Sequence, residues 1–160
     1  MKALVLFDSF FGNTEEIARS IADELGRRFE VSTIKVDAAS EDQLRGLDLL
    51  FVGSPTRGFS PSENLSAFLK RLPAGSLAGV KTGVFDTRIA LEDMKPAALR
   101  FAQKVAGYAD KKIAALLKTS GAEVLLPTEG FLVADSEGPL KDGERERAAA
   151  WARSVIDALE

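Results

Sequence analysis

Two continuous apolar runs mark the hydrophobic pattern of the chain. They are ALVLF at residues 3–7 and LLFV at residues 49–52, and polar residues bound each of them. Apolar runs of this length are typical of strands that are buried on both faces of a parallel sheet. Weaker strands are predicted at residues 31–36 (VSTIKV), 80–85 (VKTGVF) and 122–126 (AEVLL).

Apolar residues three or four positions apart predict helices between and after these strands. These stripes are Ile17, Ile21 and Leu25; Leu65, Phe68, Leu69 and Leu72; Ile113, Leu116 and Leu117; and Ala148, Trp151, Ala152, Val155, Ile156 and Leu159. We expect one more helix near Ala97–Ala106, because residues 88–109 are longer than a plain strand-to-helix connection requires. Alternation of strand and helix, repeated about five times, favours a parallel sheet with right-handed crossovers. We therefore predict an α/β fold built as a three-layer sandwich.

The composition limits the chemistry that the side chains can perform. The chain has 160 residues, 46% of them hydrophobic, and it contains neither cysteine nor histidine. This size and hydrophobic content fit one domain spanning residues 1–160. Without Cys and His, disulfides, thiolate or imidazole metal ligands and Ser-His-Asp or Cys-His catalysis are excluded. A bound cofactor is therefore the leading candidate for any difficult chemistry.

Charge and hydropathy also restrict the partners. The net charge of −3 and the lack of basic stripes argue against nucleic-acid binding. The run at residues 3–7 is too short to span a bilayer, and Met1-Lys2 leaves no room for a signal peptide ahead of it. We expect a cytoplasmic protein with no membrane association.

Three polar loops follow predicted strands and are expected to meet at one edge of the sheet, where ligands bind in open α/β folds. They are DSFFGNT at residues 8–14, GSPTRGFSPSE at residues 53–63 and DTRIALED at residues 86–93. The first loop places hydroxyls, an amide and a glycine at a helix N-terminus, where free N–H groups attract a phosphate. The alternative is that Asn13 or Thr14 only caps this helix.

Other ligand-binding families with related topologies lack their signatures in this chain. Neither the dinucleotide pattern G-x-G-x-x-G nor the P-loop pattern G-x-x-x-x-G-K-[ST] occurs. A phosphoryl-accepting receiver domain would match Asp8 and Thr87, but the strand at residues 49–52 continues into Gly-Ser-Pro, with no acceptor aspartate.

With these residues in place, the chain resembles the flavodoxin family over most of its length, from LVLFDSFFGNTEEIA to GAEVLL and AAWARSVIDAL. The family's phosphate loop has the form [ST]-x-T-G-N-T, and here it reads SFFGNT. The resemblance implies FMN as cofactor and a five-stranded parallel sheet in the order 2-1-3-4-5. It places the phosphate on Ser9, Gly12, Asn13 and Thr14, and the flavin ring between the loops at 54–59 and 86–88. The implied cofactor-binding residues are Ser9, Phe10, Phe11, Gly12, Asn13, Thr14, Ser54, Pro55, Thr56, Arg57, Gly58, Phe59, Asp86, Thr87 and Arg88.

Two positions depart from the family pattern. Phe11 stands where the family usually has a threonine that contacts the phosphate, so one hydroxyl donor is lost. Arg57 stands where many flavodoxins have a tryptophan that stacks on the flavin, and DTRIALED lacks the tyrosine usual on the other face. Phe59 is the nearest aromatic candidate.

The resemblance implies a protein that transfers electrons to redox partner proteins or to a small acceptor. One alternative is an FMN-dependent NAD(P)H:quinone-type reductase with Arg57 and residues 88–109 as a substrate wall, because PTRG resembles the flavin loop of such enzymes. A second alternative is a flavin-free binding or regulatory module, which Phe11 and the missing stacking aromatics would support.

Overall fold

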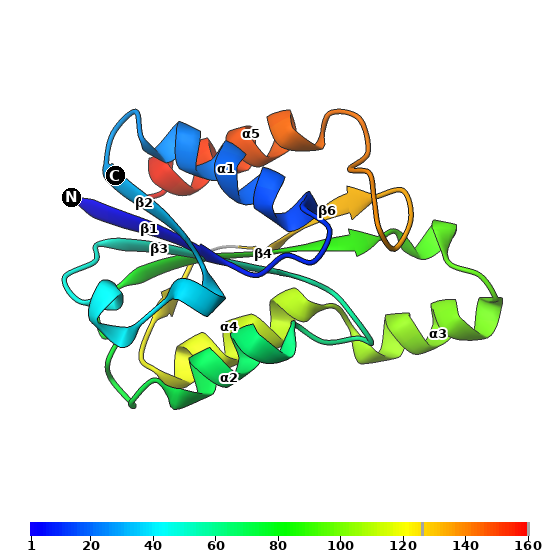
Figure 1. Ribbon diagram of the computed structural model, residues 1–160, viewed down its shortest axis with the longest axis horizontal. Coiled ribbons are helices and arrows are strands. Elements are labelled where there is room, and N and C mark those ends of the chain that lie inside the picture. The colour runs from blue at the N-terminus through cyan, green and yellow to red at the C-terminus, as the bar shows by residue number, and fades with distance from the viewer. Residues whose placement is uncertain (126, 160) are drawn as a thin grey trace.

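A parallel β-sheet forms the centre of the protein in its computed structural model, which describes residues 1–125 and 127–159 (Figure 1). The strands run in the order β2-β1-β3-β4-β5, and β6 also pairs with β4. All of these pairings are parallel. The strands are β1 (Lys2–Phe7), β2 (Glu30–Lys35), β3 (Leu49–Pro55), β4 (Lys81–Ile89), β5 (Glu123–Val124) and β6 (Glu129–Val133). The predicted α/β fold and strand order are confirmed.

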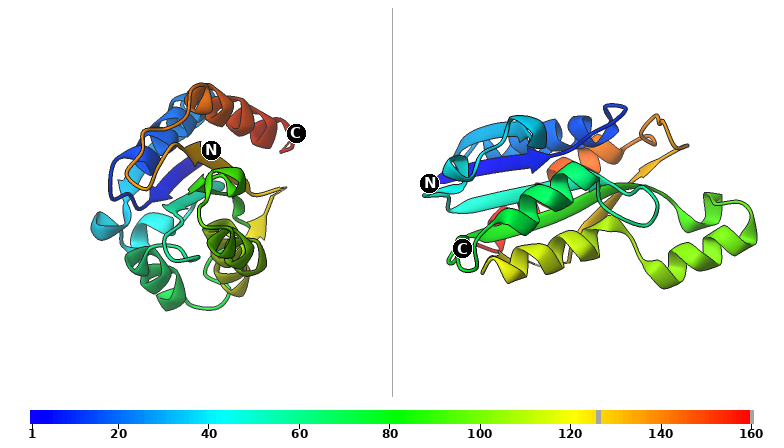
Figure 2. Two further views of the ribbon diagram at one scale, coloured as in Figure 1. Left: turned by 90° about the vertical axis from the view of Figure 1, so that its right-hand side faces the viewer. Right: turned by 60° about the horizontal axis from the view of Figure 1, so that its bottom comes forward.

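Helices cover both faces of the sheet, as Figures 1 and 2 show. On one face lie α1 and α5, and on the other lie α2 and α4. The α-helices are α1 (Asn13–Leu25), α2 (Glu63–Arg71), α3 (Ala97–Ala106), α4 (Ala109–Thr119) and α5 (Glu144–Asp157). Short 3₁₀ helices are η1 (Val36–Ala38), η2 (Glu41–Leu44) and η3 (Leu91–Asp93). No helix in the described ranges is long and apolar enough to cross a bilayer.

Two hydrophobic cores fill the spaces between the layers, because alternate residues of each strand face opposite ways. In β1, Leu4 and Leu6 enter the core under α2 and α4, whereas Val5 and Phe7 enter the core under α1 and α5. The core under α1 and α5 contains Trp151, whose ring packs edge-on against Phe51, Phe85 and Phe131 at centroid distances of 5.3, 6.2 and 6.0 Å.

The fifth position of the sheet is divided between two short segments. The predicted strand at residues 122–126 appears as β5, Glu123–Val124, and its last residue lies outside the described residues. The strand β6, Glu129–Val133, follows it and pairs with the second half of β4. Sequence reasoning missed β6 because Glu129 and Gly130 interrupt the apolar pattern. Gly130 leaves room there for Arg88, since a Cβ atom would lie 2.2 Å from its guanidinium and would displace it.

The helix expected near Ala97–Ala106 is present with those bounds, as α3. It follows β4 and η3 and projects past the carboxyl ends of the strands (Figure 1). The glycine that ends it, Gly107, has a φ of 79°, which stops the helix before α4 begins. The long connection therefore forms an arm at the same edge of the sheet as the three polar loops.

Candidate functional site

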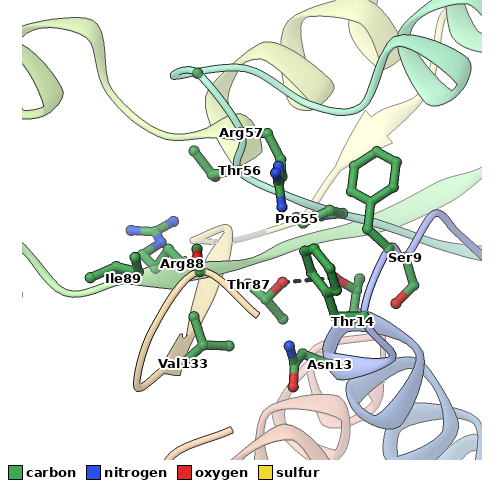
Figure 3. A pocket seen from close by; sticks show the side chains of 14 residues that line it. Ser9, Asn13, Thr14, Pro55, Thr56, Arg57, Thr87, Arg88, Ile89 and Val133 are labelled. Carbon is green, nitrogen blue, oxygen red and sulfur yellow. Dashed lines mark hydrogen bonds between the residues drawn. The ribbon is translucent and has the colours of Figure 1, made fainter. Parts of the chain in front are cut away.

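A cavity of about 230 Å³ opens at the carboxyl ends of the central strands, between the loops that follow β1, β3, β4 and β6. Figure 3 shows the side chains that line it. The lining residues are Ser9, Phe10, Phe11, Asn13, Thr14, Pro55, Thr56, Arg57, Gly58, Thr87, Arg88, Ile89, Val133 and Ser136. Among the residues implied by the family resemblance, the structure leaves Gly12, Ser54, Phe59 and Asp86 outside this lining and brings the others together.

The loop between β1 and α1 is folded by its own side chains. The hydroxyl oxygen Oγ of Ser9 accepts hydrogen bonds from the backbone N–H groups of Gly12 at 3.1 Å and Glu15 at 3.4 Å. The carboxylate of Asp8 accepts from the backbone N–H of Ser9 at 2.9 Å. Gly12 adopts a φ of 91°, a left-handed conformation that glycine takes readily and other residues rarely adopt. These bonds turn the chain tightly from strand to helix.

The same loop leaves a set of donors free. Within the described residues, the backbone N–H groups of Phe10, Phe11, Asn13 and Thr14 have no hydrogen-bond acceptor, and the N-cap residue of α1, Gly12, has no side chain that could supply one. The helix N-terminus adds a positive partial charge at this place. Because Ser9 Oγ accepts two bonds, its own proton remains available to donate. Several neighbouring donors with no charge of their own match the oxygen atoms of a phosphate group.

A pair of buried hydroxyls extends this donor set toward β4. The Oγ1 atoms of Thr14 and Thr87 lie 2.7 Å apart, and both residues are almost fully buried. Figure 3 shows this bond crossing from α1 to β4 beside the cavity. Two hydroxyls that share one hydrogen bond use only one of their two protons. The second proton can be donated to a ligand in the cavity.

The loop after β3 is held by bonds to α2 and α4. Ser54 Oγ accepts from the backbone N–H of Ser62 at 2.9 Å and donates to the carbonyl oxygen of Pro55 at 2.9 Å. The backbone of Phe59 has a φ of 67°, and its carbonyl oxygen accepts from Lys112 Nζ at 2.7 Å. Ser54 and Phe59 therefore shape the loop without lining the cavity.

Arg57 reaches from this loop toward the first loop. Its guanidinium carbon lies 5.4 Å from the ring centroid of Phe10 and 5.2 Å from that of Phe11. The two rings are 54% and 48% exposed, so neither packs beneath α1. The cationic side chain and the two phenyl rings close one side of the cavity opening by cation–π contact. The two departures from the family pattern, Phe11 and Arg57, are thus in contact with each other.

Asp86 and Arg88 belong to a charged cluster beneath the cavity. Arg88 donates to both carboxylate oxygens of Asp86, at 2.7 and 3.0 Å, and lies 3.4 Å from Asp110. The Asp86 carboxylate also accepts from Thr56 Oγ1 at 2.9 Å. The Arg88 guanidinium carbon lies 3.9 Å from the ring centroid of Tyr108. This cluster ties the ends of β3 and β4 to the start of α4.

The charges in this cluster shift one another's protonation. Burial raises the pKa of Asp86 to about 6, although the hydrogen bond and charge of Arg88 act to lower it. Burial acts to lower the pKa of Arg88, but the hydrogen bond to Asp86 and the charges of both aspartates outweigh it and raise that pKa. One cation therefore serves two carboxylates, and the cluster holds a proton more readily than an isolated ion pair would.

Three lining residues were not among the implied cofactor-binding residues: Ile89, which lies in the predicted loop at 86–93, and Val133 and Ser136, which no prediction covered. Ile89 is the last residue of β4, and its carbonyl oxygen accepts from the Tyr108 hydroxyl at 3.0 Å. Val133 ends β6, and Ser136 lies in the loop that follows. The Asn13 amide donates to the Glu137 carbonyl oxygen at 3.1 Å and holds this loop against the first one. Recognition of EGFLV as a strand would have pointed to the loop after it.

Comparison with known proteins agrees with this arrangement. The sequence model of the flavodoxin family matches residues 5–151. A search of curated proteins finds no match. The structure resembles flavodoxin 1 from Bacillus cereus, with 20% identity, a TM-score of 0.77 and 100% of each chain covered. It also resembles a WrbA-like flavodoxin from Agrobacterium tumefaciens, with 18% identity, a TM-score of 0.72 and coverage of 98% of this chain and 96% of that one.

A larger protein contains the same fold as one of its parts. Rubredoxin oxygen:oxidoreductase from Desulfovibrio gigas matches 99% of this chain with 36% of its own, at 20% identity and a TM-score of 0.73. At these identities the solved structures establish a shared fold, while the match of the family model covers most of the sequence. The chain belongs to the flavodoxin family, and it is an FMN-binding protein of electron transfer.

Proposed function

We propose that the chain is an electron carrier whose FMN phosphate is held by the loop at residues 9–14 and whose flavin ring lies between Arg57 and the end of β4. Bound FMN supplies the redox chemistry, while the protein fixes its position and its exposure to solvent. The observation that carries this proposal is the set of unpartnered N–H groups at residues 10, 11, 13 and 14, next to the Thr14–Thr87 hydroxyl pair. Such donors are costly to leave without an acceptor when they are shielded from water.

Each part of the lining has a separate task in this arrangement. The backbone N–H groups and the protons of Ser9 and Thr14 bind phosphate oxygens, and the N-terminus of α1 adds its partial charge. The Asn13 side chain positions the loop at residues 134–140 through its bond to Glu137. Asp86 holds Thr56, and through it the loop after β3, from below.

A carrier is favoured over an NAD(P)H:quinone-type reductase by the position of the arm at residues 90–108. The expected substrate wall was residues 88–109, yet only Arg88 and Ile89 at its start line the cavity, and residues 90–109 do not. The unpartnered donors favour FMN binding over a flavin-free module. A cytoplasmic site of action stays a prediction from the composition.

Flavin titration of the protein and of Thr14→Val tests the phosphate assignment. Valine keeps the shape of threonine and removes the hydroxyl, so FMN affinity should fall by about 1.5 to 3 kcal/mol, the range for a hydrogen bond to a charged group. Riboflavin, which lacks the phosphate, serves as the matched control and should bind both proteins equally. An equal loss for both flavins would place the phosphate elsewhere.

Steady-state oxidation of NAD(P)H separates the two redox functions. The FMN-loaded protein should not consume NADH or NADPH in the presence of a quinone such as benzoquinone. It should pass electrons to a one-electron acceptor after chemical reduction. Sustained NAD(P)H turnover with quinone would favour the reductase.

A further inference from the structure

Large apolar side chains that face solvent occur in two segments at the edge of the sheet where the strands end, the loop after β1 and α3. Apart from Met1, the exposed ones in the described chain are Phe10 and Phe11 in the loop after β1 and Leu99, Phe101 and Val105 in α3. Their exposed fractions run from 44% for Leu99 to 72% for Val105. Isolated exposed apolar residues need no explanation, but a set at one edge, beside a cofactor site, indicates a surface that another molecule covers.

The helix α3 buries a polar residue and exposes its large apolar ones, the reverse of an ordinary surface helix. Its one buried residue is the polar Gln103, whose side chain donates to the carbonyl oxygen of Gly107. Phe101 and Val105 are one helical turn apart and are 70% and 72% exposed. A surface helix normally turns its apolar side toward the protein. Here α3 stands past the sheet (Figures 1 and 2), and its apolar side chains are exposed to solvent.

Positive charge surrounds the apolar side of α3. The helix contains Arg100 and Lys104 and no acidic residue, and Lys95 precedes it. All three are exposed, and the cavity opening adds the exposed Arg57. The whole chain has a net charge of −3, so α3 carries a charge opposite to that of the chain as a whole. An apolar centre with a cationic border fits a partner with an apolar centre and an acidic border.

We propose that α3, together with Phe10 and Phe11, is the docking surface for an acidic electron-transfer protein that exchanges electrons with the bound flavin. This inference rests on the proposed carrier function, because the surface lies beside the cavity assigned to FMN. In the forward direction one electron leaves the reduced flavin and enters the oxidised metal centre of the partner. The cations orient the partner as it approaches, and the apolar side chains hold it with its redox centre toward the cavity.

Two other occupants fit the surface less well. A second copy bound about a two-fold axis through α3 would place Arg100 and Lys104 near the same residues of its partner, and these like charges repel. An anionic bilayer is broad and would also meet the exposed acidic residues Glu92, Asp135 and Glu137 at this edge. A protein partner can match the cationic side alone.

Two well-defined haem proteins serve as probes: cytochrome b5, which is acidic, and cytochrome c, which is basic. The ¹⁵N-labelled FMN-loaded protein is titrated with each at low ionic strength and observed by NMR. Cytochrome b5 should shift amide signals in residues 97–105 and 10–11, and cytochrome c should leave them in place. The dithionite-reduced protein, freed of excess dithionite, is then mixed with ferric cytochrome b5, and formation of ferrous haem is followed.

Charge-reversed variants locate the interaction. Arg100→Glu/Lys104→Glu should lower affinity for cytochrome b5 and the second-order reduction rate about tenfold, the low end of electrostatic steering effects. The matched control is Lys70→Glu/Lys118→Glu, which changes the net charge equally in the last turns of α2 and α4, at the opposite edge. The control should change the rate less than about threefold, because only the net charge differs. Phe101→Ala/Val105→Ala should weaken binding without changing its salt dependence.

Each result bears on one claim. Equal losses in both charge-reversed pairs, or signal shifts outside residues 97–105 and 10–11, would overturn the docking surface. Dimerisation through α3 in sedimentation would overturn it in favour of a second copy. Phe101-dependent binding to phosphatidylserine vesicles without binding to cytochrome b5 would overturn it in favour of a membrane. Normal binding at α3 without ferrous haem formation would instead contradict the carrier function.

Discussion

The β1–α1 loop and the Asp86–Arg88–Asp110 cluster lie on opposite sides of the end of β4. They differ in whether their polar groups have hydrogen-bond partners within the protein. The loop presents uncharged donors that lack acceptors within the described chain. The cluster contains full charges, and each charge is bonded to another. The buried charges of the cluster are paired with one another within the protein, whereas the donors of the loop have no acceptor in the described chain. The unsatisfied region is therefore the one that identifies the ligand.

The alternation of β4 separates these two regions. Thr87 faces the cavity and bonds to Thr14, while Asp86 faces the side of α2 and α4, and Arg88 pairs with Asp86 on that side and also lines the cavity. Three consecutive residues thus serve two environments because successive strand residues point to opposite faces. Changes at these positions should affect either stability or FMN affinity.

Replacement of Arg88 by methionine should give the largest effect. It leaves Asp86 and Asp110 in a buried site without their cation, and loss of one partner of a buried ion pair typically costs about 3 to 5 kcal/mol. Urea denaturation of the flavin-free protein at pH 7 measures this loss. Arg88→Lys keeps the charge without the two-pronged geometry and should lose less. A change below about 1 kcal/mol in Arg88→Met would mean that the cluster contributes little.

The raised pKa of Asp86 predicts how stability depends on pH. The pKa is about 6 in the folded protein and 3.8 for the ordinary group, so between these values the folded state binds the proton more strongly. The free energy of unfolding should therefore fall as pH rises from about 4 to about 6, by roughly 3 kcal/mol for this group. The contribution is fully present below the unfolded pKa.

Asp86→Asn removes this titration and provides the comparison. The free energy of unfolding of each protein is measured in urea from pH 4 to 7. The wild-type value minus the Asp86→Asn value should fall between about pH 4 and about pH 6 and then level off. The groups facing Asp86 are Arg88 and Asp110, with Tyr108 against Arg88. A flat difference, or one that rises with pH, would contradict the raised pKa.

Much of the fold follows from local pattern in the sequence. The apolar runs of β1 and β3 and the helical stripes could be placed because each signal lies within a few residues. The loops could be assigned to one edge because parallel strands end there. The strand β6 was missed because Gly130 reads as a break, although its role is to leave room for Arg88.

The charged cluster and the Arg57 contacts were not predicted for a different reason. Asp86 meets the backbone N–H of Asp110 across 24 positions of the chain, and Arg57 meets phenyl rings in a loop more than forty positions before it. Such pairs depend on how distant loops come together, and no periodic pattern records that. The sequence therefore predicted three of the four loops that line the cavity, and not which side chains satisfy one another.

Phe11→Thr tests whether one more uncharged donor in the β1–α1 loop raises the affinity for FMN. Phe11 is 48% exposed, so its removal should leave no cavity in the core. Threonine adds the hydroxyl that the family pattern has at this position, and FMN affinity should rise by at least about 1.5 kcal/mol, or roughly tenfold. Phe11→Val has the same shape without the hydroxyl and should not gain affinity. If both variants bind FMN equally, the added hydroxyl does not reach the phosphate.

Arg57 is a charged residue that lines the cavity opening, and its replacement should give the smallest effect, a shift in the midpoint potential of bound FMN. Its guanidinium lines the opening and rests on Phe10 and Phe11, near the proposed position of the flavin ring. Fully reduced flavin is commonly anionic, so a positive charge favours reduction. Unit charges about 8 Å apart at an effective dielectric of 40 interact by roughly 1 kcal/mol. For a two-electron couple, that energy corresponds to about 20 mV.

We therefore expect Arg57→Gln to lower the two-electron midpoint potential of bound FMN by about 20 mV. Because Arg57 is exposed, the shift should shrink as ionic strength rises. Arg57→Lys keeps the charge but stacks less well on phenyl rings, so it should retain most of the wild-type potential. Redox titration of the three proteins in one buffer at two salt concentrations provides the measurement. If the midpoint potential of Arg57→Lys falls as far as that of Arg57→Gln, stacking on Phe10 and Phe11 sets the potential, and the charge of Arg57 does not.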